Sequence, residues 1–156
     1  MSQRTVIFIG AGLALVILYS LVRAILPEST SPAYDSEIIS EVLRRVADEN
    51  QAGRNRTVAQ STSTSSAYVK AVYKELFGLD LPSSARDQMQ FGTTIAPPDL
   101  LPGDLIFFTD GPGYQVGFFI GGIEFGTYSA WRGAAINHLD NPSWSSRFVC
   151  VQRVIS

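Results

Sequence analysis

The sequence contains only one cysteine and one histidine among its 156 residues. A single cysteine, Cys150, excludes an intramolecular disulfide and any cluster of cysteine ligands. With His138 as the only imidazole, a zinc site would need several carboxylates to complete it, so we expect neither a metal nor a cofactor. Twelve Lys and Arg against fourteen Asp and Glu give a formal net charge of -2. This leaves no basic surplus for binding phosphates, and nucleic acid is not an expected partner.

Charged residues are also absent from Thr5 to Val22, a run of eighteen residues. Extended to Leu26, this run comes close to spanning the roughly 30 Å hydrocarbon core of a bilayer. It is longer than the apolar run of about 7–15 residues in a cleavable signal peptide, and no cysteine follows it to carry a lipoprotein anchor. We therefore predict a membrane anchor within residues 1–26, with Thr5 to Leu26 in contact with lipid. Arg4 and the terminal amine before the run, against Arg23 after it, favour a cytoplasmic amino terminus by one charge.

Residues 27–35 are polar and contain two prolines, which is typical of a linker. We therefore expect the folded domain to comprise residues 36–156. Its first helix is predicted from Ser36 to about Asn50, because the apolar residues of this segment recur at helical spacing. The stripe consists of Ile38, Ile39, Val42, Leu43 and Val46.

The stretch from Ser61 to Pro82 predicts the central helix of the domain. A polar loop changes to a helical pattern at Ser65, and Gly78 suits the left-handed conformation that ends many helices. The first turn of a helix lies at the positive end of its dipole, where an anion is stabilised. Two roles are therefore open to Ser65: it either performs chemistry or caps the helix. A second, short helix is expected within residues 83–89.

The carboxy-terminal half changes to short apolar runs separated by Gly, Pro and Asp, a pattern typical of β-strands. The composition of Thr109–Gly113 and Gly121–Gly122 predicts hairpin turns. Helices followed by an antiparallel sheet indicate an α+β domain. The runs lie at 104–108, 116–120, 123–125, 134–136 and 147–154.

Several segments in series resemble the NlpC-type cell-wall endopeptidases, which are papain-like cysteine peptidases that cleave peptidoglycan stem peptides. The resemblance covers roughly Ser36 to Val154 and implies a papain-like fold in a bacterial cell envelope. Together with the charge bias of the anchor, it predicts a single-pass protein of the bacterial inner membrane with its domain in the periplasm or outside. The segments are SSAYVKAVYKELFGLDLPSSARDQ, LLPGDLIFF, QVGFFIGGIEF and INHLDNPSWSSRFVCVQRV.

The same resemblance identifies three positions of the family's catalytic site. The nucleophilic cysteine corresponds to Ser65, the histidine base to Gln115, and the third polar residue, often histidine, to Thr127. Glutamine has no titratable nitrogen and cannot act as a general base. Serine is a weak nucleophile unless a base activates it. We therefore interpret the site as catalytically degenerate, with the fold retained and the reaction lost.

These positions and their neighbours would line the remnant of a ligand groove. Trp131 and Trp144 are further candidates for its walls. Elsewhere, Asp104 is expected to order a turn, Cys150 to pack in the core and His138 to lie at a strand end away from Ser65. The predicted groove residues are Ser65, Ser66, Tyr114, Gln115, Thr127 and Tyr128.

Three functions remain open at this point. The first is a membrane-anchored, non-catalytic NlpC-type domain that binds peptidoglycan or an envelope protein. The second is an active peptidoglycan hydrolase with Ser65 as nucleophile, which requires His138 or another base within reach. The third is a structural subunit of an envelope or secretion complex, held by the amino-terminal helix.

Overall fold

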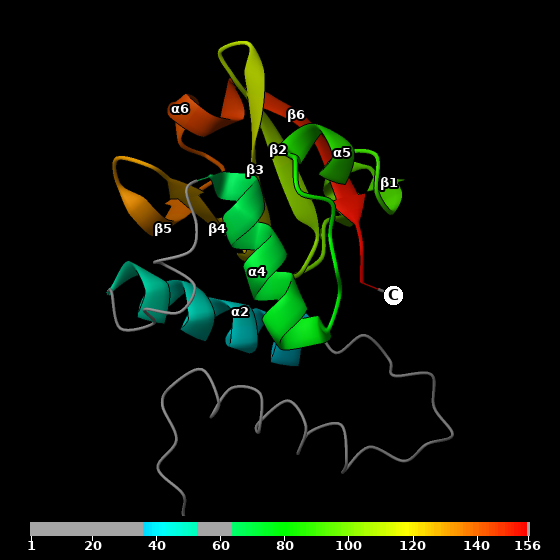
Figure 1. The fold of residues 1–156 in the computed structure, drawn as a ribbon, viewed down its shortest axis with the longest axis vertical. Coiled ribbons are helices and arrows are strands. Elements are labelled where there is room, and N and C mark those ends of the chain that lie inside the picture. The colour runs from blue at the N-terminus through cyan, green and yellow to red at the C-terminus, as the bar shows by residue number, and fades with distance from the viewer. Residues whose placement is uncertain (1–35, 53–63, 156) are drawn as a thin grey trace, which may run out of the picture.

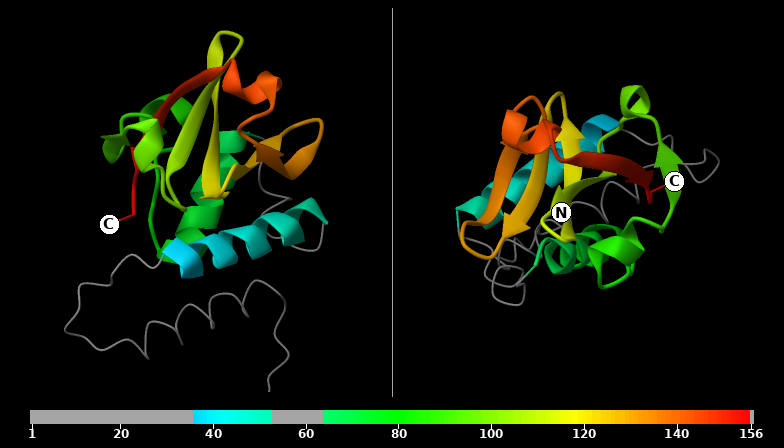
Figure 2. Two further views of the ribbon diagram at one scale, coloured as in Figure 1. Left: turned by 180° about the vertical axis from the view of Figure 1, so that it is seen from behind. Right: turned by 90° about the horizontal axis from the view of Figure 1, so that it is seen from above.

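An antiparallel sheet of six strands has two helices packed on one of its faces (Figures 1 and 2). The computed structural model describes residues 36–52 and 64–155. The predicted anchor and linker, and most of the predicted loop before Ser65, lie outside these ranges. None of the helices within the two ranges is long and apolar enough to span a membrane.

The element order confirms the predicted succession of helices and then strands. The strands are arranged β1-β6-β2-β3-β4-β5, so the last strand of the chain lies between the first two. The helices are α2 (Ser36–Gln51), α4 (Ser65–Phe77), α5 (Ala85–Gln88), the 3-10 turn η1 (Pro97–Asp99) and α6 (Pro142–Ser145). The strands are β1 (Thr93–Ile95), β2 (Leu105–Asp110), β3 (Gly113–Gly121), β4 (Glu124–Ser129), β5 (Gly133–His138) and β6 (Phe148–Arg153).

Besides the 3-10 turn η1, two of these elements were not predicted from the sequence. β1 is an edge strand of three residues, and it exists because Thr93 to Ile95 pair with Val151 to Arg153 of β6. α6 is a single turn that starts after Asn141, whose side chain accepts a hydrogen bond from the Ser143 amide. Both are too short to show a periodic pattern of apolar residues.

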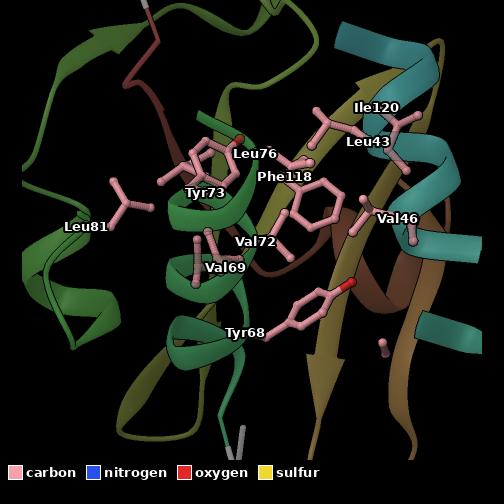
Figure 3. Packing of buried hydrophobic residues seen from close by; sticks show 14 of the residues in the cluster. Leu43, Val46, Tyr68, Val69, Val72, Tyr73, Leu76, Leu81, Phe118 and Ile120 are labelled. Atoms are coloured by element: carbon pink, nitrogen blue, oxygen red, sulfur yellow. The ribbon is translucent and has the colours of Figure 1, made fainter. Parts of the chain in front are cut away.

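The main core lies between the sheet and the helices α2 and α4. Figure 3 shows Tyr68, Val72 and Leu76 of α4 packed toward Phe118 of β3, with Leu43 of α2 closing the layer. Each of these five side chains is at most 2% exposed. The apolar spacing that predicted the two helices is therefore the spacing of the residues that they bury.

Strand β2 is buried on both faces of the sheet. Leu105 and Phe107 belong to the main core, while Ile106 and Phe108 pack on the opposite face in a smaller cluster with Trp144. Successive side chains of a strand point to opposite faces, so a strand covered on both sides is apolar at every position. This explains why the run that predicted β2 does not alternate.

Close approach of β3 and β4 requires glycine. A Cβ atom at Gly126 would lie 2.5 Å from ring atoms of Phe118, and one at Gly117 would lie 2.7 Å from the carbonyl oxygen of Gly126. Neither distance is possible for a real side chain. Gly126 therefore leaves room for the Phe118 ring, and Gly117 allows β3 to approach the backbone of β4 next to Thr127.

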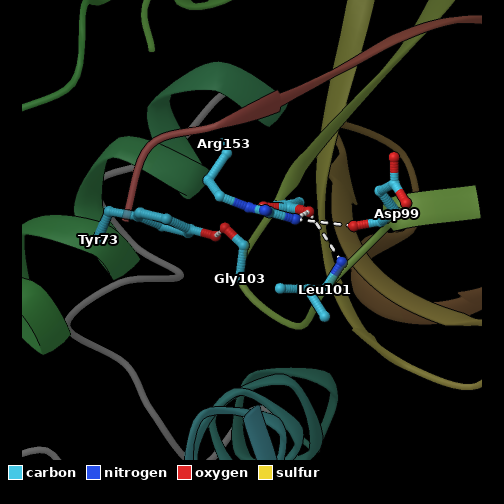
Figure 4. A network of polar contacts seen from close by, with 6 residues as sticks. Tyr73, Asp99, Leu101, Gly103 and Arg153 are labelled. Carbon is cyan, nitrogen blue, oxygen red and sulfur yellow. Dashed lines mark hydrogen bonds and ion pairs between the residues drawn. The ribbon is translucent and has the colours of Figure 1, made fainter. Parts of the chain in front are cut away.

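A partly buried ion pair connects the carboxy-terminal strand to the turn before β2 (Figure 4). The Asp104 carboxylate is 1% exposed and accepts two hydrogen bonds from the Arg153 guanidinium, at 2.9 and 2.8 Å. It also accepts one from the Leu101 amide at 2.8 Å. The hydroxyl of Tyr73 on α4 donates to the Gly103 carbonyl in the same turn. The prediction that Asp104 orders a turn is confirmed.

Candidate functional site

The amino end of α4 begins with a capping residue other than Ser65. Thr64 is the N-cap, and its hydroxyl accepts a hydrogen bond from the Ala67 amide at 3.2 Å. The suggestion that Ser65 could cap the helix is therefore wrong, because Ser65 already has helical geometry. At the other end, Gly78 has a φ of 65° and ends the helix in the predicted left-handed conformation.

Ser65 instead connects α4 to the sheet. Its side chain is 9% exposed, and its Oγ accepts a hydrogen bond from the backbone amide of Val116 at 3.1 Å. On the other side of the same residue, the Thr127 hydroxyl donates to the Val116 carbonyl at 2.7 Å. Gln115, directly before Val116 in β3, donates from its side-chain amide to the Tyr128 carbonyl at 3.3 Å. The three predicted positions are thus brought together around one residue of β3.

No group in this arrangement is suited to move a proton near neutral pH. Serine, glutamine and threonine side chains have no pKa in that range. The nearby Tyr68 is buried beneath Tyr128, with the two ring centroids 5.9 Å apart. Burial raises the pKa of Tyr68 to about 12, although the hydrogen bond from Asn50 lowers it. Tyr68 therefore remains a neutral phenol and cannot supply a base.

The single histidine lies elsewhere. His138 ends β5 with a side chain that is 54% exposed, and its Nε2 is 3.8 Å from the Glu124 carboxylate. In the β4–β5 ladder His138 is opposite Glu124, whereas Thr127 is opposite Ala135. Three residues along a strand correspond to about 10 Å. The placement of His138 at a strand end is confirmed, and it gives Ser65 no imidazole.

Cys150 is also remote from Ser65. It lies in β6 opposite Phe107 of β2 and is partly buried against the main core. Burial raises the pKa of the Cys150 thiol, while a hydrogen bond with Gln152 lowers it. A thiol with a raised pKa is a poor nucleophile, so Cys150 is a packing residue.

A cavity of about 650 Å³ lies over the Ser65 cluster. Of the predicted groove residues, five line it, and Ser66 does not. Ser66 is 7% exposed, with its hydroxyl 3.2 Å from that of Thr64. The lining residues that were predicted are Ser65, Tyr114, Gln115, Thr127 and Tyr128, joined by the two tryptophans, Trp131 and Trp144.

Sequence reasoning missed the charged and amide residues of this cavity. Asp110, Arg132, Asn137, Asn141 and Arg147 also line it. They lie on turns and strand ends where polar residues are common, so no local pattern distinguished them. No histidine, lysine or cysteine is among the described lining residues, and Asp110 is their only carboxylate. Within residues 36–52 and 64–155, no three metal-ligating side chains form a group that could hold an ion.

Comparison with known proteins identifies the family of this chain. The family model for the NlpC/P60 family matches residues 52–153. The chain belongs to the NlpC/P60 family. The match begins at the end of α2 and includes every strand, α4 and the whole Ser65 cluster.

Two curated relatives of this NlpC/P60 protein are named as a murein peptidase and as a probable endopeptidase. The murein DD-endopeptidase MepS/murein LD-carboxypeptidase of Escherichia coli (strain K12) is 35% identical over 92 residues, which cover 58% of this chain and 49% of that one. A probable endopeptidase NlpC homolog of Haemophilus influenzae is 32% identical over 90 residues, covering 58% and 48%. The chain therefore spans about half the length of the curated relatives it matches.

Solved structures share the NlpC/P60 fold at lower sequence identity. The peptidoglycan hydrolase RipB from Mycobacterium tuberculosis aligns with a TM-score of 0.62 and 18% identity, over 93% of this chain and 81% of that one. An NLP/P60 family protein from Staphylococcus aureus aligns with a TM-score of 0.61 and 24% identity, over 88% and 48%. These likenesses extend over the α+β architecture described above.

Proposed function

We propose that this protein is a non-catalytic NlpC/P60 domain that binds peptidoglycan in the cavity over Ser65. The observation that carries the proposal is the chemistry of the three residues around Val116. Ser65 accepts a hydrogen bond from the Val116 amide, and no histidine or lysine is among the described residues that line the cavity around it. Gln115 and Thr127 are engaged with backbone carbonyls. The named relatives that cleave murein provide the ligand class.

The cavity supports a binding role because it combines hydrogen-bonding groups with exposed aromatic rings. Its volume of about 650 Å³ lies within the range of small-molecule sites. Trp131 is 86% exposed, more than any other large apolar residue of the described ranges. An exposed indole at the rim of a polar cavity is suited to contact a ligand, because it provides area at low conformational cost.

We further propose that Thr5 to Leu26 anchor the protein in the bacterial inner membrane, with the domain on the outer side. The support is the uncharged run of the sequence and the bias of basic residues around it. In membranes of an expressing cell, the full chain should resist extraction by alkaline carbonate, and a variant lacking residues 1–26 should be released. Release of the full chain would contradict the anchor.

The catalytic part of the proposal is tested with the full chain in mild detergent and purified muropeptides. Chromatography of the mixture should show no hydrolysis over background. Hydrolysis that disappears in Ser65→Ala would overturn the non-catalytic assignment, because that substitution removes the hydroxyl at the position that the resemblance assigns to the nucleophile.

The binding part is tested by pelleting the same protein with purified peptidoglycan sacculi. The full chain should sediment with the sacculi, and Trp131→Ala should sediment several-fold less. Ile123→Ala is the matched control, because Ile123 is 45% exposed but does not line the cavity. Equal sedimentation of the two variants would place the binding surface outside the cavity.

A further inference from the structure

The arginines of the described ranges divide into two groups. Three pair with carboxylates: Arg44 with Glu124, Arg45 with Glu41 and Arg153 with Asp104. In residues 36–52 and 64–155, no carboxylate lies within 4.0 Å of the other three. Two of these, Arg132 and Arg147, line the Ser65 cavity, and the third, Arg86, lies over the ring of Tyr114 in its wall. The described arginines that have no carboxylate within 4.0 Å therefore lie at or beside one cavity.

Arg147 is held rigidly by neutral groups. Its guanidinium carbon lies 4.5 Å from the centroid of the Trp144 ring. Its Nε donates to the Ser143 carbonyl at 2.6 Å, and its Nη1 donates to the Thr109 carbonyl at 3.2 Å. These contacts orient the guanidinium without neutralising it. A planar guanidinium oriented in this way is suited to donate two parallel hydrogen bonds to a carboxylate, the bidentate geometry that arginine favours.

Arg132 lies beside Trp131 in the turn between β4 and β5. Both side chains are exposed, and the Arg132 amide closes the turn by donating to the Ser129 carbonyl. Against these two arginines the cavity has one carboxylate, that of Asp110. The described lining is therefore net positive in a chain with a formal charge of -2. A positively charged cavity in a protein of net negative charge attracts anionic ligands.

We propose that the cavity recognises a peptide by its free carboxylates, with Arg147 and Arg132 as the binding groups and the two indoles in contact with the peptide. This inference rests on the proposed function and names the chemical group that is bound. A carboxylate matches the arginine fork, whereas a neutral glycan would leave both charges without a partner. The stem peptide is already the substrate class that the family resemblance implies, and the arginines specify the group that is recognised on it, a free carboxylate.

The chain provides its own reporter for this binding. Both of its tryptophans line the cavity, so selectively excited tryptophan fluorescence arises only from the proposed site. The full chain in mild detergent is titrated with the tetrapeptide L-Ala-γ-D-Glu-L-Lys-D-Ala and with the same peptide amidated at every carboxyl group. The free acid should change the fluorescence in a saturable way. The amidated peptide should bind at least about tenfold more weakly, and added salt should weaken the free acid further.

Two arginine variants and a control assign the effect to residues. Arg132→Gln and Arg147→Gln should each weaken binding of the free acid by about tenfold, with Arg147→Lys between the natural protein and Arg147→Gln. Arg45→Gln removes an equal charge from the exposed pair on α2 and should leave binding unchanged. Arg132 makes no side-chain hydrogen bond in the described ranges, so its variant remains informative if Arg147 proves necessary for folding.

Equal affinity for the free and amidated peptides, or unchanged affinity in Arg132→Gln, would overturn the inference. Sedimentation with sacculi separates this failure from a failure of the proposed function. Binding to sacculi without binding to the tetrapeptide rejects carboxylate recognition alone. Absence of both rejects the two proposals together.

Discussion

The sides of α4 and its amino end have very different surroundings. Along the sides, Tyr68, Val72 and Leu76 are at most 2% exposed and fill the layer between helix and sheet. At the amino end, Thr64 and Ser65 border the cavity and accept hydrogen bonds from backbone amides. Packing against the sheet requires particular shapes and volumes, whereas the hydrogen bond to Val116 requires only an acceptor.

This contrast would allow the family fold to persist if the site residues changed, as the proposed function holds. The core side chains lose contacts and leave cavities when they are shortened, so most substitutions there are costly. On the proposed function, a hydroxyl at the amino end stands where a thiol would act, and that exchange would change the chemistry but scarcely the volume. The residues of α4 that stabilise the fold therefore differ from the residues at its amino end that face the cavity, and one set can change without the other.

The largest expected effect comes from the side of the helix. Leu76→Ala should reduce the free energy of unfolding by about 2–5 kcal/mol, because Leu76 is 2% exposed and the core cannot fully close around the gap. Lys74→Ala, two positions away and exposed, should cost less than about 0.5 kcal/mol. Urea unfolding of the two variants followed by circular dichroism measures the difference. Similar costs would mean that α4 is not held by its buried side.

A smaller effect is expected at the amino end. Ser65→Ala should cost about 1–2 kcal/mol, because the buried Val116 amide loses its acceptor. Ser65→Cys retains a weak acceptor and should cost less. Ser83→Ala is the matched control, since the exposed hydroxyl of Ser83 accepts only from Lys70. A Ser65→Ala protein as stable as the natural one would show that the bond to Val116 does not contribute to folding.

The smallest effect concerns a carboxyl on α4 and depends on pH. Desolvation, with a contribution from nearby Glu49, raises the pKa of Glu75 above its usual 4.5. Folding therefore favours the protonated form, and this contribution to stability is complete below about pH 4.5 and is lost as pH rises through the folded-state pKa. Glu75→Gln cannot ionise and should be more stable than the natural protein at pH 7, by less than about 1 kcal/mol given the partial exposure of the group.

Thermal unfolding at pH 7 and pH 4 tests this prediction. The gain in melting temperature from Glu75→Gln should be present at pH 7 and absent at pH 4. Glu41→Gln removes the exposed pair with Arg45 and should give no gain at either pH. A gain that persists at pH 4 would indicate that the glutamine side chain, and not the removed charge, stabilises the fold.

Sequence reasoning identified most of the architecture because long elements carry their own pattern. The spans of α2 and α4 follow from helical periodicity, and five of the six strands follow from apolar runs bounded by turn residues. β1 was missed because three residues carry too little pattern, and its partner β6 lies more than fifty residues later in the chain. The cap at Thr64 was missed because neighbouring polar residues are all acceptable caps by type.

For the candidate site, resemblance indicated Ser65, Gln115 and Thr127, and the structure places all three at Val116. It gave no role to Arg132, which lies outside the quoted segments, or to Arg147, which lies within one of them. Their meeting depends on how the β4–β5 turn and the segment around α6 are placed over β3. Such placement arises from contacts distant in sequence.

The sequence by itself determined which segments form helices and strands, which glycines end them and which family the chain resembles. These properties depend on residues within a few positions of one another, where periodicity and turn preferences act. Only the tertiary structure decided that Ser65 accepts a hydrogen bond from β3, that His138 lies by Glu124 and that two unpaired arginines share a cavity with both tryptophans. Those facts depend on strand register and on burial, which are set by the packing of the whole domain.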